Sequence, residues 1–180
     1  MRGSLFDVQR HLRAVLVVPV LVCALILPGC GDDSGSGDAS GSGDEAAAGP
    51  TFEAATLEGG ELASADFDGP TVLWFWAPWC TICRAEGPGV ADAAERLGDD
   101  VEVIGVAGRD EVDAMEVFVE DTGTGALTHV VDDDGSIWAA YGVTSQPAFA
   151  FIDGDGVVTD VVVGAIGEDA LIEQAQALAG

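Results

Sequence analysis

The most constraining feature of the sequence is the stretch from Thr71 to Cys83, TVLWFWAPWCTIC. Its first seven residues, up to Ala77, are β-forming or apolar and do not alternate with polar positions. Such a run is typical of a strand that is buried on both faces, at the centre of a covered sheet. A proline and a tryptophan then separate this strand from two cysteines with two residues between them. The stretch therefore predicts a central strand that ends directly at a pair of thiols.

Beyond Pro50 the sequence alternates between short apolar runs and segments with helical spacing. Strands are expected at residues 51–57, 71–77, 101–107, 127–131, 148–152 and 157–163. Helices are expected at residues 83–97, 111–121, 136–141 and 168–178. The turn signals include Gly59-Gly60 and the sequence DGDG at 153–156, which predicts a hairpin. Strands joined by helices, then a hairpin and a last helix, predict an α/β fold with a central mixed β-sheet flanked by helices.

The N-terminus carries signals for export. Three arginines precede an apolar run of 14 residues, Ala14 to Leu27, which is shorter than the roughly 17 to 25 residues of a membrane-spanning helix. The run ends in Leu27-Pro28-Gly29-Cys30, which resembles the lipobox of bacterial lipoproteins, with Pro28 in the place of the usual small residue. This resemblance implies that Cys30 is lipidated and becomes the new N-terminus. A plain cleaved signal peptide, with Cys30 as an incidental thiol, is the alternative.

Residues 30–49 are rich in Gly, Ser and Asp and lack apolar periodicity, which is typical of a flexible acidic linker. The chain thus divides into a lipoprotein-type signal peptide (1–29), this linker (30–49) and one folded domain (50–180). A flexible linker of this kind is expected where the residue at its start, here Cys30, is attached to a membrane. This favours an extracytoplasmic domain anchored by lipid to the outer face of the cell membrane, with plain secretion as the alternative.

The charge balance excludes some partners. The chain has 32 acidic residues, six arginines and no lysine, and its net charge is −26. Nucleic acid and anionic lipid would both be repelled, so neither is expected to bind. We interpret the acidic residues as a solvated surface.

The four cysteines have different expected fates. Cys23 leaves with the signal peptide and Cys30 is lipidated, so Cys80 and Cys83 remain as the thiols of the exported domain. In an oxidising compartment they are expected to form a disulfide, although so small a loop adds little stability. A structural zinc site needs two further ligands, and only His129 remains as a histidine of the domain. No metal site is therefore expected, with a copper-binding metallochaperone as an alternative.

A redox role explains more features of the pair. If Cys80 lies at the N-terminus of the following helix, free N–H groups and the helix dipole stabilise its thiolate. That thiolate can attack a partner disulfide, and Cys83, one helical turn away, can resolve the mixed disulfide. Pro78 and Trp79 would shape the apolar surface around the exposed sulfur.

The stretch WFWAPWCTIC, followed by Glu86 and Pro88, closely resembles the thioredoxin superfamily in its exported TlpA/ResA/DsbE branch, and most of all the secreted DsbE-like proteins of actinobacteria. The resemblance covers residues 50–180. It implies a thioredoxin-like fold with the inserted helix and strand of that branch, a redox-active disulfide between Cys80 and Cys83, and no cofactor. Pro88 takes the place of a proline that kinks the active-site helix.

The resemblance also identifies residues around the pair. Pro147, in SQPAFAFID, matches a cis-proline that faces the active site, and Gln146 beside it would help to guide the partner chain. Trp74 stands where thioredoxin has a buried aspartate that helps to deprotonate the resolving thiol. Glu86 is the only acid near the motif, and it is either a substitute for that aspartate or a solvated helix carboxylate.

The function that this resemblance implies is that of a thiol/disulfide oxidoreductase, with the direction of electron flow left open. Its partners would be thiols or disulfides of exported proteins and an integral membrane redox protein. A thioredoxin-fold peroxidase is an alternative, because peroxiredoxins share the fold. Their attacking cysteine follows a threonine three residues earlier, however, and that position is Ala77 here.

Overall fold

The computed structural model describes residues 48–179. The predicted signal peptide, Cys30 and nearly all of the predicted linker lie outside the described residues. The strands are β1 (Glu53–Ala55), β2 (Glu61–Ala63), β3 (Thr71–Trp76), β4 (Glu102–Gly108), β5 (Thr128–Asp132), β6 (Ala148–Ile152) and β7 (Val158–Val163). The α-helices are α1 (Thr81–Leu97), α2 (Val112–Thr122), α3 (Ser136–Ala140) and α4 (Glu168–Gln176).

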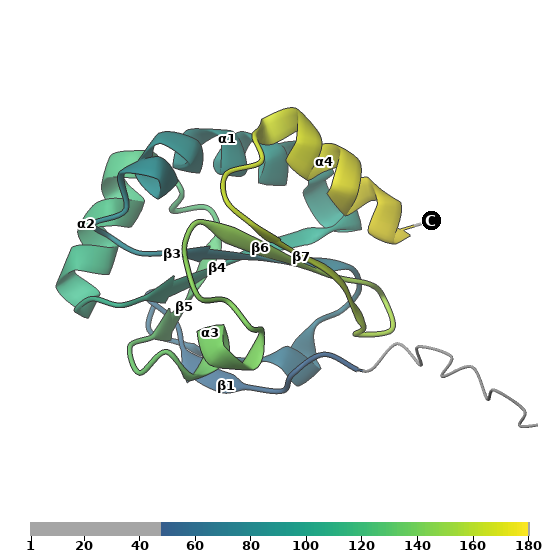
Figure 1. The fold of residues 1–180 in the computed structure, drawn as a ribbon, viewed down its shortest axis with the longest axis horizontal. Coiled ribbons are helices and arrows are strands. Elements are labelled where there is room, and N and C mark those ends of the chain that lie inside the picture. The colour runs from purple at the N-terminus through teal and green to yellow at the C-terminus, as the bar shows by residue number, and fades with distance from the viewer. Residues whose placement is uncertain (1–47, 180) are drawn as a thin grey trace, which may run out of the picture. The chain divides into compact units, whose positions relative to one another are not determined.

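Five of the strands form one mixed sheet in the order β5-β4-β3-β6-β7 (Figure 1). The strand β3 runs parallel to β4, which is parallel to β5, whereas β6 is antiparallel to both of its neighbours, β3 and β7. All six residues of β3 are buried. The predicted α/β fold with a central mixed sheet, and the central strand within residues 71–77, are therefore confirmed.

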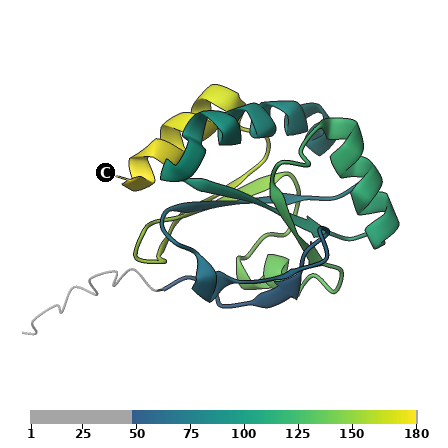
Figure 2. The same ribbon diagram turned by 180° about the vertical axis from the view of Figure 1, so that it is seen from behind.

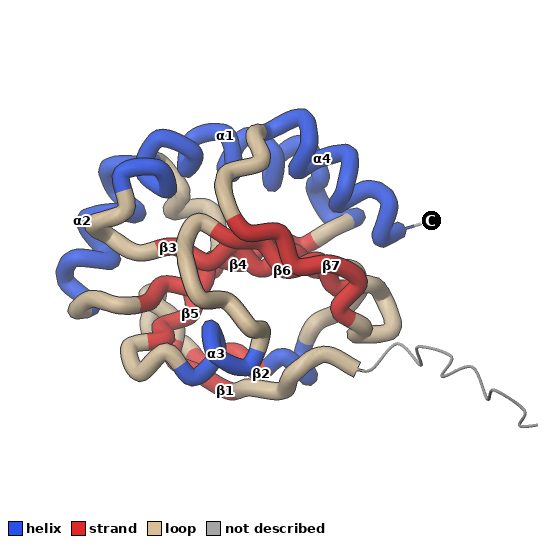
Figure 3. Tube along the Cα trace, viewed as in Figure 1, coloured by secondary structure: helices blue, strands red, loops and turns tan. Residues whose placement is uncertain are grey.

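Other elements cover both faces of this sheet. The helices α1, α2 and α4 lie on one face, and α3 and the β1–β2 pair lie on the other (Figures 1 and 3). The view from behind shows the same layers (Figure 2). Along β3, Trp74 and Trp76 belong to the core cluster beneath α1 and α2, and Phe75 belongs to the opposite cluster with Trp138. Because both faces need apolar side chains, the sequence of β3 shows no alternation.

The segment before β3 differs from the prediction. The strand expected at 51–57 is shortened to β1, which pairs antiparallel with β2 in a separate two-stranded sheet. The strand β2 was missed because three residues are too few to display a periodic pattern. The pair is joined to the edge of the main sheet by an isolated bridge between Thr56 and Val130.

Two residues assigned to the linker are paired with the domain. Ala48 forms an isolated antiparallel bridge with Val157, and the Gly49 N–H donates to the Gly156 carbonyl oxygen at 2.8 Å. Backbone contact with the domain thus extends to Ala48, two residues before the predicted boundary at residue 50. Between residues 48 and 179, no helix has the length and apolar character that a membrane crossing requires.

The strand β7 is the edge of the sheet opposite β5. Its pairing with β6 shifts register between Phe151 and Ile152. On β7 the exposed Asp160 turns its carboxylate back, so that Oδ1 accepts the Val161 backbone N–H at 2.8 Å.

Candidate active site

The two cysteines follow a tight turn at the end of β3. The Cys80 N–H donates to the Ala77 carbonyl oxygen at 3.0 Å, which closes a β-turn with Pro78 at its second position, where the fixed φ of proline is favoured. The helix α1 then begins at Thr81, two residues earlier than expected, with Cys80 as its N-cap. The Cys80 Sγ accepts the Cys83 N–H at 3.1 Å. A sulfur therefore does what a serine or aspartate oxygen usually does at a helix start.

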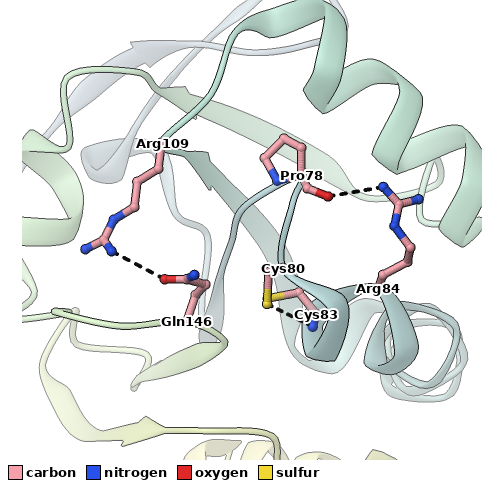
Figure 4. The surroundings of a disulfide bond; sticks show 6 residues. All are labelled: Pro78, Cys80, Cys83, Arg84, Arg109 and Gln146. Atoms are coloured by element: carbon pink, nitrogen blue, oxygen red, sulfur yellow. Dashed lines mark hydrogen bonds between the residues drawn. A yellow bond between two sulfur atoms is a disulfide. The ribbon is translucent and has the colours of Figure 1, made fainter.

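Cys80 and Cys83 form a disulfide with a Cα–Cα distance of 5.3 Å (Figure 4). Cys83 is completely buried, and Cys80 keeps 6% of its surface exposed. An incoming thiolate must reach one of the two sulfurs. The exposure of the two residues thus makes Cys80 the point of attack and Cys83 the leaving group.

The surface beside Cys80 is apolar. Trp79 and Ile82, on either side of it in sequence, are each 56% exposed. Pro78, by contrast, is buried, although it belongs to the turn. Pro78 and Trp79 were expected to shape this surface, but only Trp79 is exposed to solvent. Ile82, which was not expected there, contributes to the same surface.

The loop before β6 lies at the carboxyl end of β3, where the cysteine turn begins. In the antiparallel register of β3 and β6, Phe75 lies opposite Ala148, so Pro147 lies next to the end of β3 where the cysteine turn begins. The Gln146–Pro147 peptide bond is cis, as the resemblance implies. Pro147 is buried and Gln146 is half-buried. The sequence-predicted residues of both segments are thus brought together.

Arg109 is a residue of this site that the sequence interpretation missed. It directly follows β4, which is parallel to β3, so both strands end at the same edge; this topology is the signal that could have identified it. Its carbonyl oxygen accepts the Trp79 Nε1–H at 3.1 Å. Its Nη1 lies 3.4 Å from the Gln146 Oε1 (Figure 4). Arg109 therefore connects the tryptophan of the cysteine turn with the loop before β6.

Arg84, the residue after Cys83, was missed as well. Its Nη2 donates to the Pro78 carbonyl oxygen at 3.1 Å (Figure 4), and its Nη1 forms an ion pair with Asp121 at 2.8 Å. The guanidinium carbon also lies 5.1 Å from the centre of the Phe118 ring. These contacts fasten the cysteine turn to α2.

Glu86 is not a solvated carboxylate. It is half-buried, and its Oε1 accepts the Ile166 backbone N–H at 3.0 Å. Burial raises the pKa of the Glu86 carboxyl, while the backbone N–H groups of Ile166 and Gly167 and the Trp74 indole lower it in part. Its second oxygen, Oε2, and the Trp74 Nε1 are buried without a hydrogen-bond partner. The acid thus lies against the residue that replaces the buried aspartate of thioredoxin.

A raised pKa of Glu86 predicts a particular pH dependence of stability. Because the pKa of Glu86 is raised in the folded protein, the folded protein binds a proton at this carboxyl at a higher pH than the unfolded chain does. The contribution of this carboxyl to the free energy of unfolding therefore increases as the pH falls towards 4.5. We expect the unfolding free energy of the wild type, relative to Glu86→Gln, to rise between pH 7 and pH 4.5 in urea titrations. Glu95→Gln removes an exposed carboxylate from the same helix and serves as the control. Equal pH dependence of both variants would contradict the prediction.

His129 lies in the core and not on the surface. It is the second residue of β5 and completely buried, and its Nε2 lies 3.0 Å from the Thr124 carbonyl oxygen. Burial lowers the pKa of His129, against smaller opposing effects of that carbonyl and of Glu58. The ring meets Trp76 edge-on at 5.4 Å between centroids. In the described part of the chain, no three His, Cys, Asp or Glu side chains are grouped closely enough to hold a metal ion.

Comparison with known proteins gives consistent matches. Residues 45–161 match the AhpC/TSA family. The soluble secreted antigen MPT53 of Mycobacterium tuberculosis is 43% identical over 111 residues, which is 61% of this chain and 63% of MPT53. The chain therefore spans less than two thirds of the length of that relative.

Two further matches cover more of their counterparts. The thiol:disulfide interchange protein DsbE of Pseudomonas fluorescens is 33% identical over 135 residues, covering 72% of this chain and 74% of DsbE. The structure of MTB DsbF in its mixed oxidised and reduced forms superimposes with a TM-score of 0.67 and 44% identity, over 71% of this chain and 94% of DsbF. The family match at residues 45–161 includes the cysteine turn, and the fold is thioredoxin-like.

Proposed function

The chain belongs to the AhpC/TSA family with a thioredoxin-like fold, and on this premise we propose that it is an extracytoplasmic thiol/disulfide oxidoreductase. The matches to DsbE and DsbF confirm the resemblance to DsbE-like proteins. The observation that carries the proposal is the Cys80–Cys83 disulfide at the start of α1, with the first cysteine the more exposed of the two residues.

The reaction that this site supports is a two-step exchange. A client thiolate attacks the Cys80 Sγ, the Cys80–Cys83 bond breaks, and Cys83 leaves as a thiolate. The second thiolate of the client then attacks the mixed disulfide, so the client is oxidised to a disulfide and Cys80 leaves as the second thiolate. Run backwards, the same steps reduce a client disulfide. The Cys83 N–H, which donates to the Cys80 Sγ, stabilises negative charge on that sulfur in either direction.

Glu86 has a role in the reverse direction. Cys83 and Glu86 are three residues apart on α1, so they share one face of the helix. Cys83 must lose its proton before it can resolve a mixed disulfide. A half-buried carboxyl with a raised pKa is a suitable acceptor for that proton. Glu86 thus substitutes for the aspartate that Trp74 replaces.

The remaining parts of the proposal concern location and partners. The signal peptide (1–29) directs export, Cys30 carries the lipid, and the linker (30–49) tethers the folded domain (50–180) to the outer face of the membrane. Gln146 and Pro147 guide the client chain. The clients are exported proteins, and an integral membrane protein restores the redox state of the pair. Supporting observations are the apolar run, the lipobox-like sequence and a relative that is a secreted antigen.

The reduction potential of the Cys80/Cys83 pair tests the proposal. We expect one reversible two-electron couple when the protein is equilibrated with glutathione or dithiothreitol buffers and followed by tryptophan fluorescence. A value near about −120 mV would make the protein a donor of disulfides, and one near about −270 mV would make it a reductant. The absence of any reversible couple would refute the redox function.

A further inference from the structure

Arg109 differs from the other cations of the domain. The described residues include three arginines, and the whole chain has no lysine. Arg84 and Arg96 pair with carboxylates at 2.8 and 2.6 Å. Arg109 is exposed, and within residues 48–179 it forms no ion pair, although Asp110 and Glu111 follow it directly. It is thus an uncompensated positive charge on a protein of net charge −26.

The Arg109 side chain is nevertheless held in place. Its Nη2 donates to the Thr144 carbonyl oxygen at 3.0 Å, its Nη1 contacts the Gln146 Oε1 at 3.4 Å, and the guanidinium carbon lies 4.4 Å from the centre of the Trp138 ring. These contacts use two of the five N–H donors of a guanidinium. Donors therefore remain for an acceptor that arrives from outside.

The backbone of Arg109 is also unusual. It is the one non-glycine residue with positive φ, at 63°, in the described part of the chain. Such a conformation costs free energy and persists where the surrounding structure enforces it, often at functional sites. It brings the carbonyl oxygen of Arg109 to the Trp79 indole, while the guanidinium reaches the loop that precedes Pro147. The charge thereby lies beside Gln146, in the loop before Pro147, on the side of Gln146 that faces away from the disulfide (Figure 4).

A client that reaches Cys80 must pass along the cysteine turn and the loop before Pro147, and its charge matters there. The protein as a whole repels anionic chains, whereas Arg109 offers a carboxylate both charge and hydrogen bonds. We propose that Arg109 is a specificity-determining residue, which binds client segments that carry Asp or Glu next to the reacting cysteine. The inference rests on the proposed function, because it names the substrate class of the same site.

The test compares two reduced dithiol peptides that differ only by Asp or Asn next to the first cysteine. Each peptide reduces the oxidised full chain by the exchange described above, and tryptophan fluorescence gives its second-order rate constant. We expect the Asp/Asn ratio of rate constants to fall about threefold in Arg109→Gln, the effect of one exposed ion pair. The effect of Asp on the thiol of its own peptide cancels, because the same peptides are used with every variant.

Arg96→Gln is the matched control. It removes the same charge from α1, where Arg96 pairs with Glu168, and we expect it to leave the ratio unchanged. Arg109→Lys keeps the charge without the planar fork and should give an intermediate ratio. If the ratio is the same in the wild type and in Arg109→Gln, the inference is wrong. If the wild type reacts with neither peptide, the proposed function itself fails.

A measurement on the wild type alone covers the case that the variants do not fold. At about 1 M salt the Debye length is about 3 Å, so an exposed ion pair is largely screened. We expect the Asp/Asn ratio of the wild type to fall about threefold between about 0.01 M and 1 M salt. A ratio independent of salt would overturn the inference.

Discussion

Replacing Cys80 with serine abolishes thiol–disulfide exchange, with an expected loss on the order of 10³-fold or more in the rate constant of the reduced protein with disulfide-bonded peptides. A serine oxygen forms no mixed disulfide, and the other cysteine of the pair, Cys83, is completely buried. The measurement is stopped-flow fluorescence of the reduced wild type with a disulfide-bonded peptide, and consumption of the same peptide by the reduced variant is measured in parallel. Substantial exchange by Cys80→Ser would mean that Cys83 reacts directly, against the assigned roles.

The Cys83→Ser variant separates attack from resolution. Cys80 stays accessible and can form a mixed disulfide, but no second protein thiol is present one turn along α1 to resolve it. When the Cys80 thiolate attacks a disulfide-bonded client peptide, we therefore expect the covalent adduct to accumulate, and intact mass spectrometry detects it. The same experiment on Cys80→Ser should give no adduct. Adducts on both variants would contradict the assignment of Cys80 as the reactive sulfur of the pair.

Gly105→Ala lowers the free energy of unfolding by about 2 to 3 kcal/mol. Gly105 lies on β4 beneath the His129 ring, and an added Cβ would overlap the His129 Nδ1, lie 2.7 Å from its Cε1 and lie 2.8 Å from the Trp76 Nε1. Neither ring is free to move. His129 contacts the Thr124 carbonyl oxygen at 3.0 Å, and Trp76 stacks on Phe118 with 4.1 Å between centroids.

A second glycine provides the control. At Gly89 in α1, an added Cβ would meet only the Glu168 Cβ, at an ordinary 3.6 Å. Since glycine is unfavourable inside a helix, we expect Gly89→Ala to stabilise the protein by about 0.5 to 1 kcal/mol. Urea unfolding of both oxidised variants at one pH measures the two effects. If Gly105→Ala were as stable as Gly89→Ala, the close packing of β4 against the His129 ring would be refuted.

Local sequence patterns were sufficient to predict most of the architecture. The apolar run from Thr71 to Ala77 could only be a covered strand, and the cysteines directly after it had to lie at the edge of the sheet. The helical spacing after Cys83 predicted that both cysteines lie at the N-terminus of one helix. These predictions succeeded because each depends on residues that are adjacent or one turn apart.

The missed features depend on contacts between distant segments. The role of Arg109 comes from Trp79 and Gln146, 30 and 37 residues away in sequence, and the partial burial of Glu86 depends on Ile166, 80 residues away. The complete burial of His129 follows from its position opposite Gly105 in the parallel pairing of β4 and β5. Such register cannot be read from one strand alone, because it is set by the assembled sheet.

The open edge at β7 has a consequence for the proposed exchange with client chains. An exposed edge strand offers free backbone groups to any extended peptide, and this leads to unwanted β-pairing and aggregation. On β7 the register shift disturbs the regular spacing of those groups, and Asp160 occupies the Val161 N–H while adding a charge. These two features disfavour the pairing of a client chain with β7 as an additional strand while the client is bound at Cys80.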